Sequence, residues 1–117
     1  MNPGRWEAML HEVTALHGVR GALVISADDG LVVHQAAVEG LETGDVAALA
    51  SALVRRSELL AQALNGDAVR LCTLAAERGT LIAARGGAGL WVVAVAEPDA
   101  ELGRLRLLLG DLAPELG

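Results

Sequence analysis

The chain has 117 residues, of which 9 are basic and 15 acidic, giving a formal net charge of −6. This length predicts a single domain over residues 1–117, because folded domains usually contain roughly 100–150 residues. The acidic balance and the complete lack of Lys argue against nucleic acid as a partner, since phosphate binding relies on clustered Lys and Arg.

The single cysteine and the short apolar segments indicate the cellular compartment of the protein. Cys72 cannot form an intrachain disulfide, which suits a reducing compartment. The longest uncharged stretch, residues 86–96, is far shorter than the ~18–20 residues that span a bilayer. The N-terminus also lacks the pattern of a signal peptide. We therefore expect a cytoplasmic protein that does not insert into a membrane.

The first third of the chain predicts a helix followed by a β-hairpin. Apolar residues at helical spacing indicate an amphipathic helix over residues 5–16, and Gly18 is a typical residue at a helix end. Two β-branched runs, residues 21–26 and 31–34, flank an Asp-Gly pair, which is the strongest short-range hairpin signal. Neither run alternates cleanly between apolar and polar residues, so we expect both faces of the sheet to be covered.

The remainder predicts a long helix, three strands and a last helix. The long helix covers residues 45–64, with Thr43 or Asp45 as its N-cap and Asn65-Gly66 at its end. The strands and the final helix, which Asp99 can cap, are expected at residues 68–75, 80–85, 90–97 and 100–112. Five strands joined mostly by hairpins, together with three helices, predict an α+β fold with helices on the faces of a sheet.

The long helix is apolar on nearly every side. One stripe, expected to face the sheet, consists of Val46, Leu49, Ala50, Leu53, Leu60 and Leu64. A second stripe lies on a different side and consists of Ala48, Ala52, Leu59 and Ala63. A helix of this kind is usually buried on more than one side. We favour contact with another subunit over an exposed helix that is rich in Ala only for its helix propensity.

The strand at residues 68–75 is apolar on both faces. It contains no Pro, and its one charge, Arg70, lies near its start. If it is an edge strand, it is poorly protected against pairing with another chain, which fits a dimer joined edge to edge. We therefore predict that the dimer interface combines the second stripe of the long helix with part of this strand. The residues of that interface are Ala48, Ala52, Leu59, Ala63, Val69, Arg70, Leu71, Cys72, Thr73 and Leu74.

The three His and one Cys do not form a recognisable metal site. His11 and His17 are six residues apart on one predicted helix, roughly on opposite sides, and His34 is alone on a strand. Cys72 has no Cys or His at the spacing that metal sites use. The glycine run at residues 86–89 leads into a strand rather than the helix that a phosphate loop requires. The sequence predicts no catalytic residue, metal or cofactor, and we expect the protein not to be an enzyme.

Three segments together resemble the roadblock/dynein light-chain domain family. They are residues 18–26 (Gly-Val-Arg-Gly-Ala-Leu-Val-Ile-Ser) with the Asp-Asp-Gly-Leu-Val run at 28–32, the helix start at 45–50 (Asp-Val-Ala-Ala-Leu-Ala), and residues 99–106. The last segment is similar to the Ala-x-Leu-Gly-x-x-Arg opening of the family's final helix. The resemblance covers nearly the whole chain.

The resemblance implies an α-β-β-α-β-β-β-α domain with a five-stranded, mainly antiparallel sheet in the order 2-1-5-4-3 and helices on both faces. Such domains dimerise through the third strand, with the two copies of the second helix side by side. Family members commonly bind small Ras-like GTPases or serve as scaffolds, and the prokaryotic MglB-like members are GTPase activators.

The resemblance therefore implies a non-catalytic homodimeric regulator or scaffold that binds a small Ras-like GTPase as its activating or localising partner. The candidate GTPase contacts are the polar residues of the long helix, Arg55, Arg56, Glu58 and Gln62. A scaffold without GTPase contact is one alternative. A small-molecule sensor is another, although such a pocket needs converging polar groups and the sequence offers few beyond His34 and Thr73.

Overall fold

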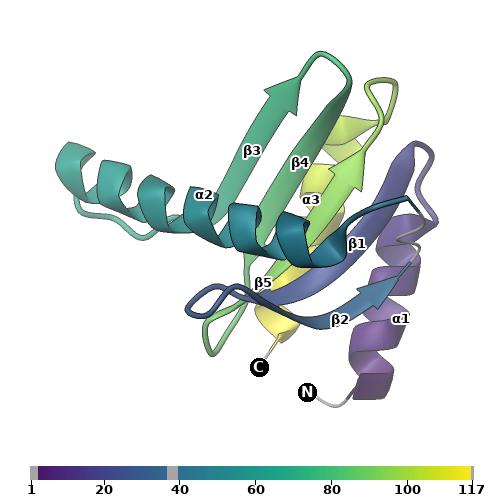
Figure 1. Cartoon of the computed structure of the whole chain (residues 1–117), viewed down its shortest axis with the longest axis horizontal. Helices are drawn as coiled ribbons and strands as arrows, with labels where there is room; N and C mark the ends of the chain where they lie inside the picture. Colours follow the sequence, from purple (N-terminus) through teal and green to yellow (C-terminus); the bar gives the residue numbers. More distant parts are fainter. Residues whose placement is uncertain (1–2, 37–39, 117) are drawn as a thin grey trace.

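The computed structural model describes residues 3–36 and 40–116. These residues form three α-helices, five strands and a short 3-10 helix, and the α-helices and strands are labelled in Figure 1. In chain order these are α1 (Pro3–Thr14), β1 (Val19–Ser26), β2 (Leu31–Ala36), α2 (Thr43–Leu64), β3 (Leu71–Ala76), β4 (Gly79–Arg85), β5 (Leu90–Ala96), α3 (Leu102–Leu112) and η1 (Ala113–Glu115). The predicted elements are all present, and the largest shift is at β3, which begins at Leu71 rather than at residue 68.

The strands form one sheet in the order β2-β1-β5-β4-β3, and every neighbouring pair is antiparallel. This confirms the predicted fold class and strand order. β2 and β3 are the two edges of the sheet, and β5 lies at its centre between β1 and β4. The hairpin β3–β4 extends beyond the layer of helices in Figure 1.

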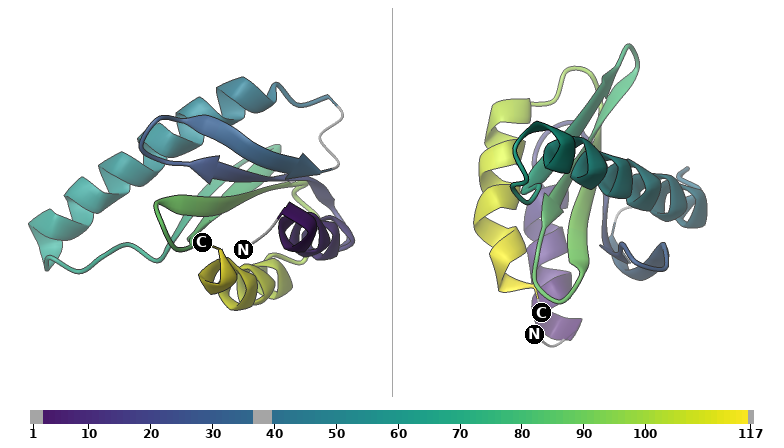
Figure 2. Two further views of the ribbon diagram at one scale, coloured as in Figure 1. Left: turned by 90° about the horizontal axis from the view of Figure 1, so that it is seen from below. Right: turned by 90° about the vertical axis from the view of Figure 1, so that its left-hand side faces the viewer.

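Helices cover both faces of the sheet, as Figure 2 shows. α1 and α3 lie on one face, where Leu10, Val13, Leu105 and Leu109 are fully buried against the sheet. α2 lies on the other face, above a second core that contains Trp91 of β5. Alternate side chains of each central strand therefore enter two different cores, which explains why β1, β4 and β5 lack a clear apolar–polar alternation.

The prediction that both faces are covered holds for β1 but is wrong for β2. Residues 21–25 of β1 are all buried. In β2 the residues alternate between exposed and half-buried, and Leu31 and Val33 are exposed. The physical reason is the position of β2 at the edge of the sheet, where a neighbouring strand, β1, flanks its side chains on one side alone.

The predicted sheet-facing stripe of α2 is only partly right. Val46, Ala50 and Leu53 pack into the core beneath α2, as expected. The other three residues of the stripe are largely exposed: Leu49 71%, Leu60 61% and Leu64 74%. The helix is rotated about its axis relative to the prediction, and its last turns project past the sheet (Figure 1).

The residues of α2 that face the sheet are small. The four buried positions are Ala47, Ala50, Ser51 and Val54. The hydroxyl of Ser51 donates to the carbonyl oxygen of Ala47 at 2.8 Å, so this buried polar group is satisfied within the helix. Close approach is also possible because Gly30, in the β1–β2 turn, lies against the backbone of the helix at Ala48.

The predicted N-caps of the two later helices are wrong. α2 begins at Thr43 with Glu42 as its N-cap, and α3 begins at Leu102 with Glu101 in that position. Neither N-cap residue makes a side-chain hydrogen bond to its helix. Asp99 instead lies 3.3 Å from the ring Nε2 of His17. The end of α2 is as predicted, since Asn65 is the C-cap and Gly66 has a positive φ of 81°.

Candidate interaction surface

β3 forms an open edge of the sheet. Along an antiparallel strand, the backbone groups of alternate residues point to opposite sides. The N–H of Arg85 in β4 donates to the carbonyl oxygen of Arg70 at 2.9 Å. By this alternation Cys72 and Leu74 bond to β4, whereas Leu71, Thr73 and Ala75 direct their N–H and C=O groups away from it. A second strand can add to the sheet here.

Large apolar side chains lie exposed on the α2 side of this edge. Leu74 of β3 is 54% exposed, and Leu59 in the second half of α2 is 63% exposed. Cys72, which shares its face of the sheet with Leu74, belongs to the core beneath α2. Together with Leu60 and Leu64 these side chains give the α2 face far more exposed Leu than isolated surface positions would explain, and such surfaces mark interaction sites.

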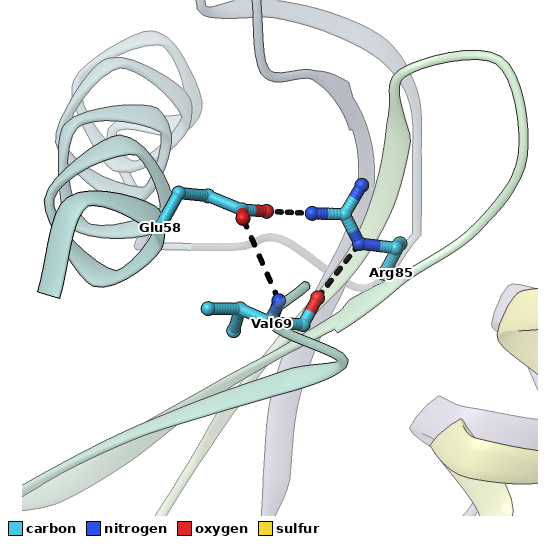
Figure 3. A network of polar contacts seen from close by, with 3 residues as sticks. All are labelled: Glu58, Val69 and Arg85. Carbon is cyan, nitrogen blue, oxygen red and sulfur yellow. Dashed lines mark hydrogen bonds and ion pairs between the residues drawn. The ribbon is translucent and has the colours of Figure 1, made fainter. Parts of the chain in front are cut away.

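A group of three residues joins the second half of α2 to the beginning of β3 (Figure 3). Arg85, at the end of β4, forms an ion pair with Glu58 of α2. Its Nε donates to the carbonyl oxygen of Val69 at 2.7 Å, and the N–H of Val69 donates to Glu58 Oε2 at 3.5 Å. The guanidinium also lies over the ring of Trp91, 4.9 Å from its centroid. We call Glu58, Val69 and Arg85 the clasp.

The clasp links the two parts of the predicted interface. Glu58 is on α2, and Val69 lies two residues before the first residue of the edge strand, Leu71. Both backbone groups of Val69 are engaged within the chain. The clasp therefore fixes α2 relative to β3 and ends the open part of the edge at Leu71.

The ten predicted interface residues lie in different environments. Six of them are exposed: Ala48, Leu59, Ala63, Arg70, Thr73 and Leu74. Ala52, Val69 and Leu71 are half-buried, and Cys72 is buried. Val69 packs against the core beneath α2, whereas Leu71 packs against the core on the other face. Their part in a dimer stays a prediction.

The four predicted GTPase contacts are also divided. Arg55 Nη1 donates to the carbonyl oxygen of Ala27 at 2.9 Å, and Glu58 belongs to the clasp. Arg56 and Gln62 are exposed. Arg55 and Arg56 line a shallow hollow of about 320 Å³ together with Ala52 and Leu59. This hollow places two cations beside apolar side chains on α2.

Sequence reasoning missed Arg85, because the partners that give it a role are distant in the sequence. A charge at the end of a predicted strand was visible, but its pairing with Glu58 depends on how α2 crosses the sheet. A groove of about 280 Å³ on the other face was also unforeseen. It runs between β3–β4 and the end of α3, where Leu71, Ala84, Ala113 and Pro114 contribute apolar lining and Arg70 is at its side.

Neither a metal site nor a membrane-spanning helix is found in the parts of the chain that the structure describes. Over residues 3–36 and 40–116, no three side chains of His, Cys, Asp or Glu gather where they could hold a metal ion. None of the helices in these ranges is long and apolar enough to cross a membrane.

The family model for the Roadblock/LC7 domain matches residues 6–96, which is most of the chain. The chain belongs to the Roadblock/LC7 family. This agrees with the resemblance seen in the sequence. A search of the curated proteins finds no match.

Solved structures share the fold over nearly their whole length. MglB from Myxococcus xanthus is 16% identical, with a TM-score of 0.86 over 98% of this chain and 94% of that one. A Roadblock/LC7 domain from Streptomyces avermitilis is 21% identical, with a TM-score of 0.81 over 92% and 91%. An MglB described as having a tetrameric arrangement is 22% identical, with a TM-score of 0.81 over 98% and 94%. At these identities the likeness concerns the fold.

Proposed function

We propose that this Roadblock/LC7 protein is a non-catalytic homodimeric scaffold that binds a small Ras-like GTPase. The observation that carries the dimer is the joint exposure of an open β3 edge and of Leu side chains on α2 and β3. Pairing two copies through β3 makes one continuous sheet and brings the two α2 helices together. An MglB that shares the fold is described as having a tetrameric arrangement, which supports self-association but not a particular interface.

The paired α2 helices form the platform for the GTPase. Arg56 and Gln62 present exposed polar groups, while Arg55 and Glu58 also hold the helix to its own chain. Family membership and the MglB neighbours support a regulatory rather than a catalytic role. If hydrolysis is accelerated, the dimer acts by binding one conformation of the GTPase more tightly, which shifts its population. The arginines of α2 are contact residues in this proposal, not catalytic ones.

The dimer is tested first, with Leu59→Asp. In the single chain Leu59 is mostly exposed, so the aspartate costs little folding stability. At the proposed interface it buries a charge without a partner, which we expect to weaken the dimer about 100-fold, equivalent to roughly 3 kcal/mol. Sedimentation at micromolar concentration measures the effect.

Leu107→Asp is the matched control, because Leu107 is 72% exposed on α3, on the opposite face of the sheet. We expect this variant to remain a dimer like the parent. If both variants sediment as the parent does, α2 is not part of the interface. If the parent itself is a monomer, the proposal of a homodimer is wrong.

The GTPase is tested by mixing the purified protein with a Ras-like GTPase from the same source in its GTP-bound and GDP-bound forms. We expect a complex that forms preferentially with one nucleotide state of the GTPase. The charge reversal Arg56→Glu should weaken this complex. Phosphate release in the same mixture distinguishes an activator from a scaffold. If the protein is a dimer but binds the GTPase in neither nucleotide state, the proposed GTPase contact is wrong. The alternative raised by the sequence, a scaffold without GTPase contact, then stands.

A further inference from the structure

We propose that two copies pair β3 with β3 in one specific register, with the two-fold axis at Thr73, and that the clasp sets this register. Thr73 then lies opposite Thr73 of the second copy, and Leu71 lies opposite Ala75. This inference rests on the proposed homodimer and adds to it which residues meet. It follows from counting the backbone groups that the edge leaves free.

The free groups of the edge are confined to three residues. Leu71, Thr73 and Ala75 direct their N–H and C=O groups outward, as the hydrogen bond between Arg85 and Arg70 requires. Towards the N-terminus the strand does not continue to Val69, whose side chain packs against the core beneath α2 and not on the face of Leu71. The N–H and C=O of Val69 are already bonded to Glu58 and Arg85, so the clasp keeps this residue out of the edge (Figure 3).

The other end of the edge is closed by a tight turn. Ala76 pairs with Gly79, so the chain turns at residues 77–78 and β4 begins. Residues beyond Ala75 therefore do not continue the edge in the direction of the strand. A second copy can bond only to the backbone of Leu71, Thr73 and Ala75.

Only one antiparallel register uses all three residues on both copies. With the axis at Thr73, Leu71 pairs with Ala75, Thr73 with Thr73, and Ala75 with Leu71. Moving the axis to Cys72 would pair Ala75 with Val69, whose groups are occupied. Moving it to Leu74 would pair Leu71 with Glu77 in the turn. Each shifted register loses one of three bonded pairs, and unpaired backbone groups at a buried interface are unfavourable.

Side chains and charges fit the same register. On the α2 face, Leu74 of each copy lies opposite Cys72 of the other, so the exposed leucine covers the edge of the core. The antiparallel arrangement also brings the start of one strand to the end of the other. Arg70 then lies near Glu77 of the second copy, and within the described part of the chain neither has an ion-pair partner. Two such contacts form around the axis.

Disulfide cross-linking distinguishes the registers, because a residue on the two-fold axis faces itself. Directly opposite residues have Cα atoms about 4.5–5.5 Å apart, within the range that a disulfide bridges. A residue one position from the axis is about 8 Å from its copy, which is too far. Three proteins with a single Cys are compared: the parent with Cys72, Cys72→Ala with Thr73→Cys, and Cys72→Ala with Leu74→Cys.

After mild oxidation with diamide we expect a reducible covalent dimer at least tenfold more abundant for Thr73→Cys than for the other two proteins. A second measurement does not depend on whether the Thr73→Cys variant folds. Leu71→Cys and Ala75→Cys, each in Cys72→Ala, should cross-link when mixed and not separately.

Preferential cross-linking of the parent Cys72 or of Leu74→Cys would show a shifted register and overturn this inference, while the homodimer would stand. A dimer in sedimentation that cross-links in none of these tests would show that β3 is not the contact, which also overturns it. A monomer in sedimentation would overturn the homodimer itself.

Discussion

The two faces of the sheet use their leucines in opposite ways. In α3 the large residues Leu105 and Leu109 are buried against the sheet. In α2 the side facing the sheet consists mainly of small residues, and the large ones, such as Leu49 and Leu60, point outward. A helix that only covered a core would have the reverse arrangement. In the homodimer that we propose, α1 and α3 stabilise the domain, while α2 serves both the domain and the second copy.

The largest effect is expected from a matched pair of leucines on these two faces. Leu109→Ala removes a fully buried side chain and leaves a cavity, so we expect the free energy of unfolding to fall by about 3 kcal/mol. Leu60→Ala removes a side chain that is mostly exposed and should change the unfolding of the monomer by less than about 0.5 kcal/mol. Urea titrations at low protein concentration measure both.

The concentration dependence of the same titrations sharpens the comparison. If α2 contacts a second copy, the parent becomes more stable as protein concentration rises, because a partner that binds only the folded state stabilises it. Leu60→Ala should lose part of that gain and Leu109→Ala should retain it. Equal effects of the two substitutions on the dilute monomer would remove the distinction between the faces.

The sequence predicts the elements well, because they depend on local patterns. The spacing of apolar residues marks the helices, and glycine-containing turns mark the hairpins. The rotation of α2 could not be predicted in the same way. Its two apolar stripes are similar in strength, so the pattern alone does not decide which side meets the sheet. In the structure the buried side consists of Ala47, Ala50, Ser51 and Val54, of which the first stripe contains Ala50 alone.

In the candidate interaction surface, too, local features could be predicted from the sequence and features that depend on the fold could not. The apolar character of β3 was visible in the sequence, but its place at the edge came from the family resemblance, since strand order is not a local property. Glu58 was predicted only as a polar contact of α2. Its pairing with Arg85 and Val69 requires α2 to cross the sheet at one particular angle, which no local pattern encodes. The N-caps failed because neither helix uses a side-chain cap.

A smaller effect is expected at the clasp, which joins the two parts of the predicted interface, α2 and β3. Arg85→Leu removes the ion pair to Glu58, the hydrogen bond to Val69 and the contact with Trp91. Both charged side chains are partly exposed, so solvent screens the ion pair. We expect the free energy of unfolding to fall by about 1–2 kcal/mol, mainly from the hydrogen bond to a charged donor. Thermal or urea unfolding provides the measurement.

Arg104→Leu is the matched control, because the ion pair of Arg104 with Glu101 is exposed on α3. We expect a change below about 0.5 kcal/mol. In a double-mutant cycle, Arg85→Leu should also be coupled to Glu58→Gln, whereas Arg104→Leu should not. Independent effects of Arg85 and Glu58 would contradict the role of the clasp in holding α2 to β3.

The smallest effect has the opposite sign and tests whether α3 is free where Gly110 borders the groove beside β3–β4. Gly110 lies within α3, and a Cβ added there would meet no heavy atom within 4 Å. Gly110→Ala should therefore raise the free energy of unfolding by roughly 0.5–1 kcal/mol through helix propensity. Gly86→Ala is the contrasting control, since its Cβ would lie 2.6 Å from the Cβ of Leu116 and 2.8 Å from the carbonyl oxygen of Ala113, and we expect it to be destabilising. Sedimentation of Gly110→Ala provides a further test. If this variant stabilises the monomer but weakens its self-association, α3 also contacts a partner. Partner contact would then not be confined to the α2 face of the sheet.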